Sequence, residues 1–162
     1  MKTVLGIDVG TQSSKVMFYD FENRKVVALA SAAHDIISRE DGTSEQEPAW
    51  WAEAVRSALG QVDPAIRDTA VALAVSGQQH GLVSLDDDGE PTAPAKLWND
   101  TSTVKQCDEL TDAFGGRERL ISELGNPILP GYTAGIHRRK NPLAEAEQSR
   151  SLRPDPARSA PP

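Results

Sequence analysis

Residues 6–13, Gly-Ile-Asp-Val-Gly-Thr-Gln-Ser, have the side-chain types that bind phosphate and a divalent cation. Asp8 follows an apolar run, and a carboxylate at the end of a strand can hold Mg²⁺ or its water ligands. Gly10 lets the backbone approach an anion closely, because it has no Cβ. Successive backbone N–H groups of such a turn can point at phosphate oxygens. The other candidate phosphate ligands are Thr11, Gln12, Ser13 and Lys15.

The same segment is also compatible with an ordinary β-hairpin whose turn contains glycine. The Gly-x-x-x-x-Gly-Lys-Ser/Thr spacing of a P-loop is absent. A dinucleotide-binding fingerprint is excluded, because a strand pattern follows the turn where a helix should begin. The segment is therefore either a phosphate-binding turn between two strands or a hairpin without a ligand.

Two further polar clusters, residues 77–81 and 98–100, each follow an apolar run. Amide and imidazole groups between glycines can converge on the hydroxyls of a sugar or polyol, and a tryptophan can cover an apolar face of it. The candidate substrate-binding residues are Gln79, His80, Trp98 and Asp100. The alternatives are a structural histidine, a core tryptophan and an aspartate that only caps the following helix.

The elements that must position these clusters can be read from hydrophobic periodicity. Strands are expected at 4–8, 14–20, 26–33, 82–85 and 95–98, with a polar loop at 34–47. The continuous apolar run 70–76 favours a strand that is buried on both faces. Helices are expected from Pro48, over 103–114 and over 117–124. This order of a three-stranded meander, a helix and a parallel strand indicates an α/β fold that resembles ribonuclease H.

Composition limits the class of protein. The net charge of −7 argues against a nucleic-acid-binding surface. No apolar run approaches the ~20 residues of a membrane span, and the first residues lack the basic-then-apolar pattern of a signal peptide. The single cysteine excludes an internal disulfide framework. We therefore expect a cytoplasmic protein whose partner is a small molecule, and not nucleic acid or a membrane.

The composition changes near residue 134. Residues 135–162 contain five of the eleven prolines, five arginines and almost no large apolar side chains. Such a segment cannot bury enough surface to offset its chain entropy. We expect one domain over 1–134 and a disordered tail over 135–162, with the composition that an out-of-frame reading of a GC-rich gene would give. A genuine disordered tail is the alternative.

Five segments together resemble the FGGY family of carbohydrate kinases, and within it the xylulokinases. They are Gly-Ile-Asp-Val-Gly-Thr at 6–11, Ser-Glu-Gln-Glu-Pro at 44–48 with Trp50-Trp51, Ser-Gly-Gln-Gln-His-Gly at 76–81, Leu-Trp-Asn-Asp at 97–100 and Gly-Asn-Pro-Ile-Leu-Pro-Gly-Tyr-Thr-Ala at 125–134. Their order and spacing fit over residues 1–134. The first segment alone would indicate only the wider superfamily of actin, hexokinase and heat-shock chaperones, and not the FGGY family.

The resemblance implies an incomplete N-terminal domain of the actin and hexokinase type. It implies ATP and Mg²⁺ as cofactors and phosphoryl transfer to D-xylulose, with Asp8 near the metal and the transferring phosphate. It also implies that Gln79 and His80 bind the sugar, although xylulokinases often have methionine at the position of Gln79. A homodimer is left open for the full-length protein.

The chain also departs from the family pattern. The general-base aspartate of such kinases lies in a segment that matches no position here, so we expect the 162 residues alone to be inactive. The alternatives are a sugar-binding or regulatory module without catalysis, a kinase for another pentulose or polyol, and a chaperone-like ATPase. The cluster at 77–81 argues against the last, because a chaperone has no need of a sugar-binding loop.

Overall fold

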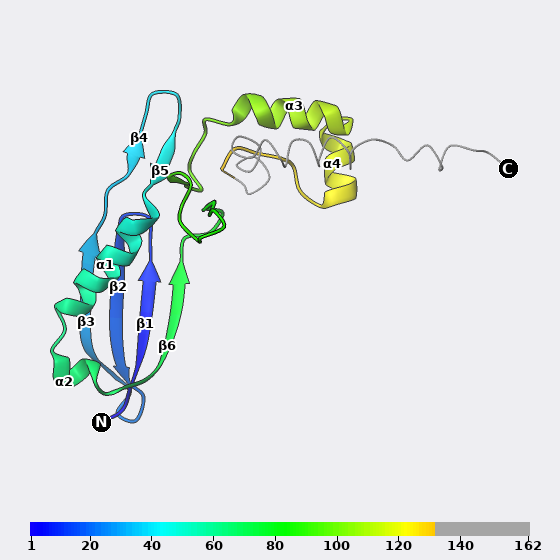
Figure 1. The fold of residues 1–162 in the computed structure, drawn as a ribbon. Coiled ribbons are helices and arrows are strands. Elements are labelled where there is room, and N and C mark those ends of the chain that lie inside the picture. The colour runs from blue at the N-terminus through cyan, green and yellow to red at the C-terminus, as the bar shows by residue number, and fades with distance from the viewer. Residues whose placement is uncertain (132–162) are drawn as a thin grey trace. The chain divides into compact units, whose positions relative to one another are not determined.

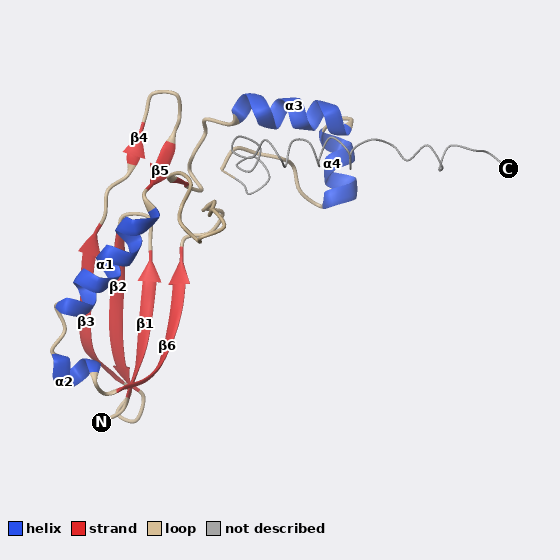
Figure 2. Cartoon of the chain, viewed as in Figure 1, coloured by secondary structure: helices blue, strands red, loops and turns tan. Residues whose placement is uncertain are grey.

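The computed structural model describes residues 1–131, which divide into two compact units, 1–102 and the described residues from 103 onward. Unit 1 contains a four-stranded sheet in the order β3-β2-β1-β6 (Figures 1 and 2). Its strands are β1 (Thr3–Val9), β2 (Ser13–Asp20), β3 (Lys25–Ala33) and β6 (Ala70–Gly77). The first three form an antiparallel meander, and β6 lies parallel to β1. The predicted α/β, ribonuclease H-like arrangement is confirmed.

The core of unit 1 lies between this sheet and α1 (Pro48–Gly60). Strand alternation sends Val16 and Phe18 toward the helix and Lys15 and Met17 to the opposite face. Ala58 is fully buried, and its small side chain allows the helix to approach the sheet closely. Figure 1 shows α1 lying across β2 and β3. The buried cluster comprises Leu5, Val16, Phe18, Ala58 and Val62.

The prediction that the apolar strand 70–76 is buried on both faces is wrong for the described residues. Every residue of β6 is exposed, and Leu73 and Val75 are 65% and 63% accessible. β6 is an edge strand, and α1 packs against β1, β2 and β3 instead. An apolar run becomes buried only where other elements cover it, and no described element covers β6.

A second, small sheet has two of its three strands in the region predicted as a polar loop, and its third strand lies within the strand predicted at 95–98. Its strands are β4 (Ile37–Ser38), β5 (Ser44–Gln46) and β7 (Ala95–Lys96), in the order β4-β5-β7. Hydrophobic periodicity did not predict β4 and β5, because strands of two or three residues are too short to show a period. The strand expected at 82–85 is reduced to isolated bridges, Leu82 with Lys96 and Leu85 with Pro91.

The short helix α2 (Pro64–Arg67) completes unit 1, and α3 (Val104–Phe114) and α4 (Arg117–Leu124) form the described part of unit 2. Gly115 and Gly125 end α3 and α4 with φ of 98° and 79°, a left-handed conformation that glycine adopts without strain. Both helices were predicted within one residue of their bounds. The expected tail, 135–162, lies outside the described residues.

Candidate active site

The predicted phosphate-binding turn lies where two parallel strands end together. Asp8 and Val9 of β1 pair with Ser76 and Gly77 of β6, so the turn after β1 and the loop after β6 leave the same edge of the sheet. The backbone N–H of Gln78 donates to the Val9 carbonyl at 2.9 Å. Ligands of open α/β sheets bind at this edge.

The turn between β1 and β2 presents unpaired backbone donors. The Gly10 N–H donates to the Ser13 carbonyl at 3.1 Å and closes the turn. A Cβ at Gly10 would stand 3.1 Å from that carbonyl oxygen, which explains the glycine. Among the described residues, the backbone N–H groups of Thr11 and Gln12 have no hydrogen-bond partner. Adjacent unpaired N–H groups form an anion-binding concavity.

One cavity of about 430 Å³ brings together most of the predicted site. All five predicted phosphate ligands line it, and so does one predicted sugar ligand, Trp98. The Trp98 indole N–H donates to the Thr11 hydroxyl at 3.1 Å, which ties the aromatic ring to the turn. The lining residues are Gly10, Thr11, Gln12, Ser13, Lys15, Ile36, Trp98 and Asn99.

Asp8 lies beside this cavity rather than in it. Its side chain is exposed and lines a neighbouring groove with Ser76, Met17 and Leu29. Lys15 lines both spaces and stands opposite Asp8 in the β1–β2 ladder. A carboxylate and an ammonium group therefore flank the same side of the turn.

The loop after β6 reaches the turn through Gln78, which belongs to the predicted polar cluster at 77–81 but was not among the predicted substrate ligands. The Thr11 hydroxyl donates to Gln78 Oε1 at 3.0 Å. Gln79 and His80, the predicted sugar ligands, are both exposed and line none of the described cavities. His80 has φ of 59°, a left-handed conformation that is unusual for a residue with a side chain.

Asp100, which was predicted to bind substrate, lines none of the described cavities. It is fully buried, and both carboxylate oxygens are occupied. Oδ2 accepts from Lys96 Nζ at 2.7 Å and from the Ser44 N–H at 2.9 Å, while Oδ1 accepts from the N–H and hydroxyl of Ser102. Burial would raise the pKa of Asp100, but the hydrogen bonds from Lys96, Ser102 and Ser44 outweigh it and lower that pKa.

Comparison with known proteins identifies the family. The model of the N-terminal domain of the FGGY family of carbohydrate kinases matches residues 3–138. This chain belongs to that family. The match ends at residue 138, slightly beyond the boundary expected at 134.

Curated FGGY relatives and solved structures agree with this assignment. The chain is 39% identical over 137 residues to the xylulose kinase of Haemophilus influenzae, covering 80% of this chain and 28% of that protein. It is 43% identical over 136 residues to the xylulose kinase of Lactococcus lactis, covering 82% and 26%. The structure of a xylulose kinase from Bifidobacterium adolescentis matches with a TM-score of 0.70 and 31% identity, covering 83% and 28%. The chain thus spans about a quarter of the length of the curated relatives it matches.

The residues of this FGGY chain fit an Mg²⁺–nucleotide complex better than a metal ion alone. No group of three or more histidine, cysteine or acidic side chains in the described part of the chain could hold a metal ion. Mg²⁺ commonly uses one or two carboxylates together with substrate phosphates and water. Asp8 would supply such a carboxylate, and the unpaired turn N–H groups would hydrogen-bond the phosphate oxygens. No helix within residues 1–131 is long and apolar enough to cross a membrane.

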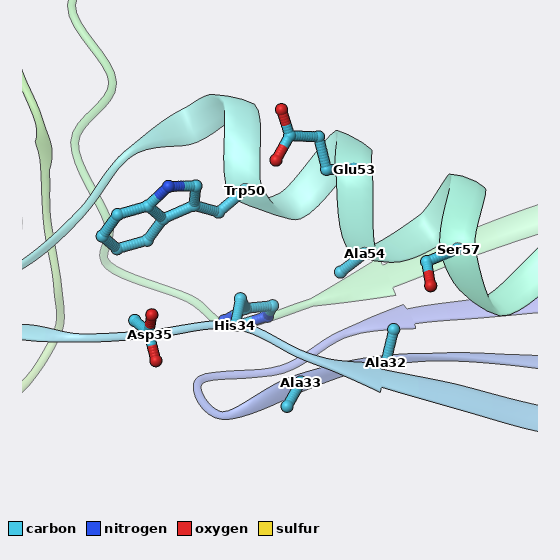
Figure 3. Close-up of a pocket in the computed structure, with 8 residues that line it drawn as sticks. All are labelled: Ala32, Ala33, His34, Asp35, Trp50, Glu53, Ala54 and Ser57. Carbon is cyan, nitrogen blue, oxygen red and sulfur yellow. The ribbon is translucent and has the colours of Figure 1, made fainter.

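A separate pocket of about 340 Å³ lies between the end of β3 and the start of α1 (Figure 3). Trp50 and Glu53 extend from the helix on one side, and His34 and Asp35 lie on the other. His34 Nδ1 is 2.9 Å from Gln46 Nε2, while His34 Nε2 is buried without a hydrogen-bond partner among the described residues. Burial lowers the pKa of His34, and the charge of Asp35 opposes this effect.

The lowered pKa of His34 predicts a pH-dependent stability. The unfolded state binds the proton first, so the free energy of unfolding should be highest above the ordinary pKa of 6.5 and fall as the pH decreases toward the folded-state pKa. His34→Gln should flatten this decline, measured as urea midpoints by circular dichroism between about pH 5 and 7.5. Asp35→Asn removes a charge that raises the pKa of His34. The decline in the free energy of unfolding should therefore extend to lower pH in this variant. An unchanged slope in His34→Gln would contradict the prediction.

Proposed function

We propose that this chain forms the phosphate-facing part of a sugar kinase site, and that the protein phosphorylates D-xylulose to D-xylulose 5-phosphate with ATP and Mg²⁺. The observation that carries the proposal is one cavity lined by Thr11, Gln12 and Trp98, in which the backbone N–H groups of Thr11 and Gln12 have no partner among the described residues. Hydrogen-bond donors for phosphate and an aromatic ring for the sugar therefore line the same cavity. The xylulose kinase relatives support the choice of sugar.

Each residue has a proposed role. The turn Gly10–Ser13 holds phosphate oxygens through its backbone, and Lys15 adds positive charge. Asp8 binds the metal directly or through water, and bound Mg²⁺ would neutralise charge that develops on the transferring phosphoryl group. Gln79, His80 and Trp98 contact the sugar. Asp100 instead supports the loop that carries Trp98.

The test is a chimera in which residues 1–131 of this chain replace the matching part of the Haemophilus influenzae relative. We expect D-xylulose-dependent ADP release from the chimera and none from the 162-residue chain alone, because the general-base aspartate that the family resemblance implies matches no position in this chain. Phosphoryl transfer depends on positioning both reactants, which contributes ~7–11 kcal/mol when they are held together. An inactive chimera that folds would contradict the proposal. Turnover by the chain alone would overturn its expected inactivity.

Two alternatives give different results in the same assay. A kinase for another pentulose or polyol would turn over with that compound. Gluconate, a sugar acid, is also included because the structure of a gluconate kinase from Lactobacillus acidophilus matches at 26% identity. A sugar-binding or regulatory module would bind D-xylulose without ADP release in either protein. A homodimer and a cytoplasmic location are further parts of the proposal, to be checked by ultracentrifugation and fractionation.

In the chimera, His80→Ala should lower kcat/KM for D-xylulose by about 5- to 150-fold, the effect of leaving a hydrogen-bonding group of the sugar unpaired. The left-handed backbone at His80 complicates this variant, because alanine is strained there. His80→Gly is the matched variant, since glycine adopts that conformation freely. If His80→Gly retains wild-type kcat/KM, His80 is a structural residue.

A further inference from the structure

Gln46 lies at the end of β5 and has no role in the site described so far. It is fully buried although it is polar. Its carboxamide contacts four segments, namely the turn after β1, the loop after β6, helix α1 and residues 34–35. A buried amide with this many partners contributes to local geometry as well as to stability.

The orientation of the Gln46 carboxamide follows from its partners. The Trp51 indole N–H can only donate, so the atom it meets at 2.9 Å must be the oxygen, Oε1. The backbone carbonyl of Thr11 can only accept, so the atom 2.8 Å from it must be the nitrogen, Nε2. The two ends of the side chain are therefore not interchangeable.

The same reasoning fixes the neighbouring groups. Trp98 donates to the Thr11 hydroxyl, which leaves that hydroxyl proton for Gln78 Oε1. Gln78 Nε2 then donates to Gln46 Oε1 at 3.0 Å. Thr11, Gln78 and Gln46 thus form a closed ring of three hydrogen bonds, each in a determined direction.

This ring has a consequence for the phosphate-binding turn. The Thr11 hydroxyl proton is directed toward Gln78, so the donor of Thr11 that remains unpaired among the described residues is its backbone N–H. Gln46 holds the Thr11 carbonyl, on the adjoining peptide group. The direction of the Thr11 and Gln12 N–H groups therefore depends on a residue outside the cavity.

We propose that Gln46 is a positioning residue that fixes the turn at Thr11 and Gln12 against the loop at Gln78, and so orients the anion-binding N–H groups and Trp98. The role of those groups in binding phosphate rests on the proposed function. The geometric coupling itself can be tested without any enzymatic activity.

The test uses the complete 162-residue chain labelled with ¹⁵N. Gln46→Met keeps the length of the side chain and removes all of its hydrogen bonds. Loss of the Trp51 indole contact is expected from any structural role, and so is a shift of the Thr11 and Gln12 amides, because Gln46 bonds the Thr11 carbonyl directly. The deciding signal is therefore the Trp98 indole, which makes its hydrogen bond to the Thr11 hydroxyl and not to Gln46. We expect the Trp98 indole resonance to shift and its proton to exchange faster with solvent.

Two variants keep the test interpretable. Gln61→Met is the matched control, because Gln61 donates to the carbonyls of Ser31 and Ser57, and it should leave the Trp98 indole signal unchanged. Gln78→Met opens the ring at a half-buried residue, so it remains informative if Gln46→Met does not fold. It should reproduce the shifts at Thr11, Gln12 and Trp98 while the Trp51 indole keeps its bond to Gln46.

Titration with inorganic phosphate is the second readout. In the wild-type chain phosphate should shift the Thr11 and Gln12 amides, and Gln46→Met should weaken this response by about 2- to 10-fold, the range of one hydrogen bond. If phosphate does not shift the wild-type amides, the result counts against the proposed function, and the Trp98 indole shift still decides the role of Gln46. If Gln46→Met or Gln78→Met moves only contacts of its own side chain, the inference is wrong.

Discussion

Replacing Lys96 by methionine should lower the free energy of unfolding of unit 1 by about 3–5 kcal/mol, because it leaves the buried Asp100 carboxylate without its cation. The Lys96 side chain is 2% exposed, and Nζ lies 2.7 Å from Asp100 Oδ2 and 3.3 Å from Glu45 Oε1. Urea unfolding followed by tryptophan fluorescence measures this, since Trp50, Trp51 and Trp98 all lie in unit 1.

Arg39→Met is the matched control for this prediction. Arg39 forms an ion pair with the same Glu45 at 3.4 Å, but its side chain is 57% exposed, so its loss should cost less than about 1 kcal/mol. Adding Asp100→Asn to Lys96→Met should recover part of the stability, because one uncompensated charge is removed. Equal effects of the Lys96 and Arg39 substitutions would show that burial does not govern this network.

Asp8→Asn in the chimera should lower kcat for D-xylulose by about 10²- to 10³-fold, the range for removing one group that stabilises transition-state charge. The amide keeps the shape of the side chain and removes its negative charge. Asp8 lines a groove with Lys15 and with none of the proposed sugar ligands, so KM for the sugar should change little. Steady-state kinetics with ATP and sugar varied separately give both values.

Asp87→Asn is the control for Asp8→Asn, because Asp87 is an exposed carboxylate in the turn at 86–89. It should leave kcat and KM unchanged. A kcat for Asp8→Asn within about threefold of the parent chimera would remove Asp8 from the catalytic machinery, since a metal-binding carboxylate cannot be that dispensable. A selective rise in KM for the sugar would instead place Asp8 on the substrate side.

Several features of this protein followed from local sequence pattern. The alternation in 14–20 and the glycines around the turn predicted the meander and the position of the turn between β1 and β2. The apolar run at 70–76 predicted a strand parallel to β1, which brought the loop after it to the same edge. These predictions succeeded because periodicity and turn chemistry depend on neighbours in the sequence.

The exposure of side chains and the long-range polar partners were decided by tertiary structure alone. Asp100 looked like a free acceptor after a strand, but Ser44, 56 positions away, and Lys96 occupy its carboxylate. Gln46 was predicted to lie in a polar loop, but it is buried and forms hydrogen bonds with several distant segments. A polar residue carries the same letter whether water or a distant backbone group satisfies it, so only the folded chain shows which of them face a ligand.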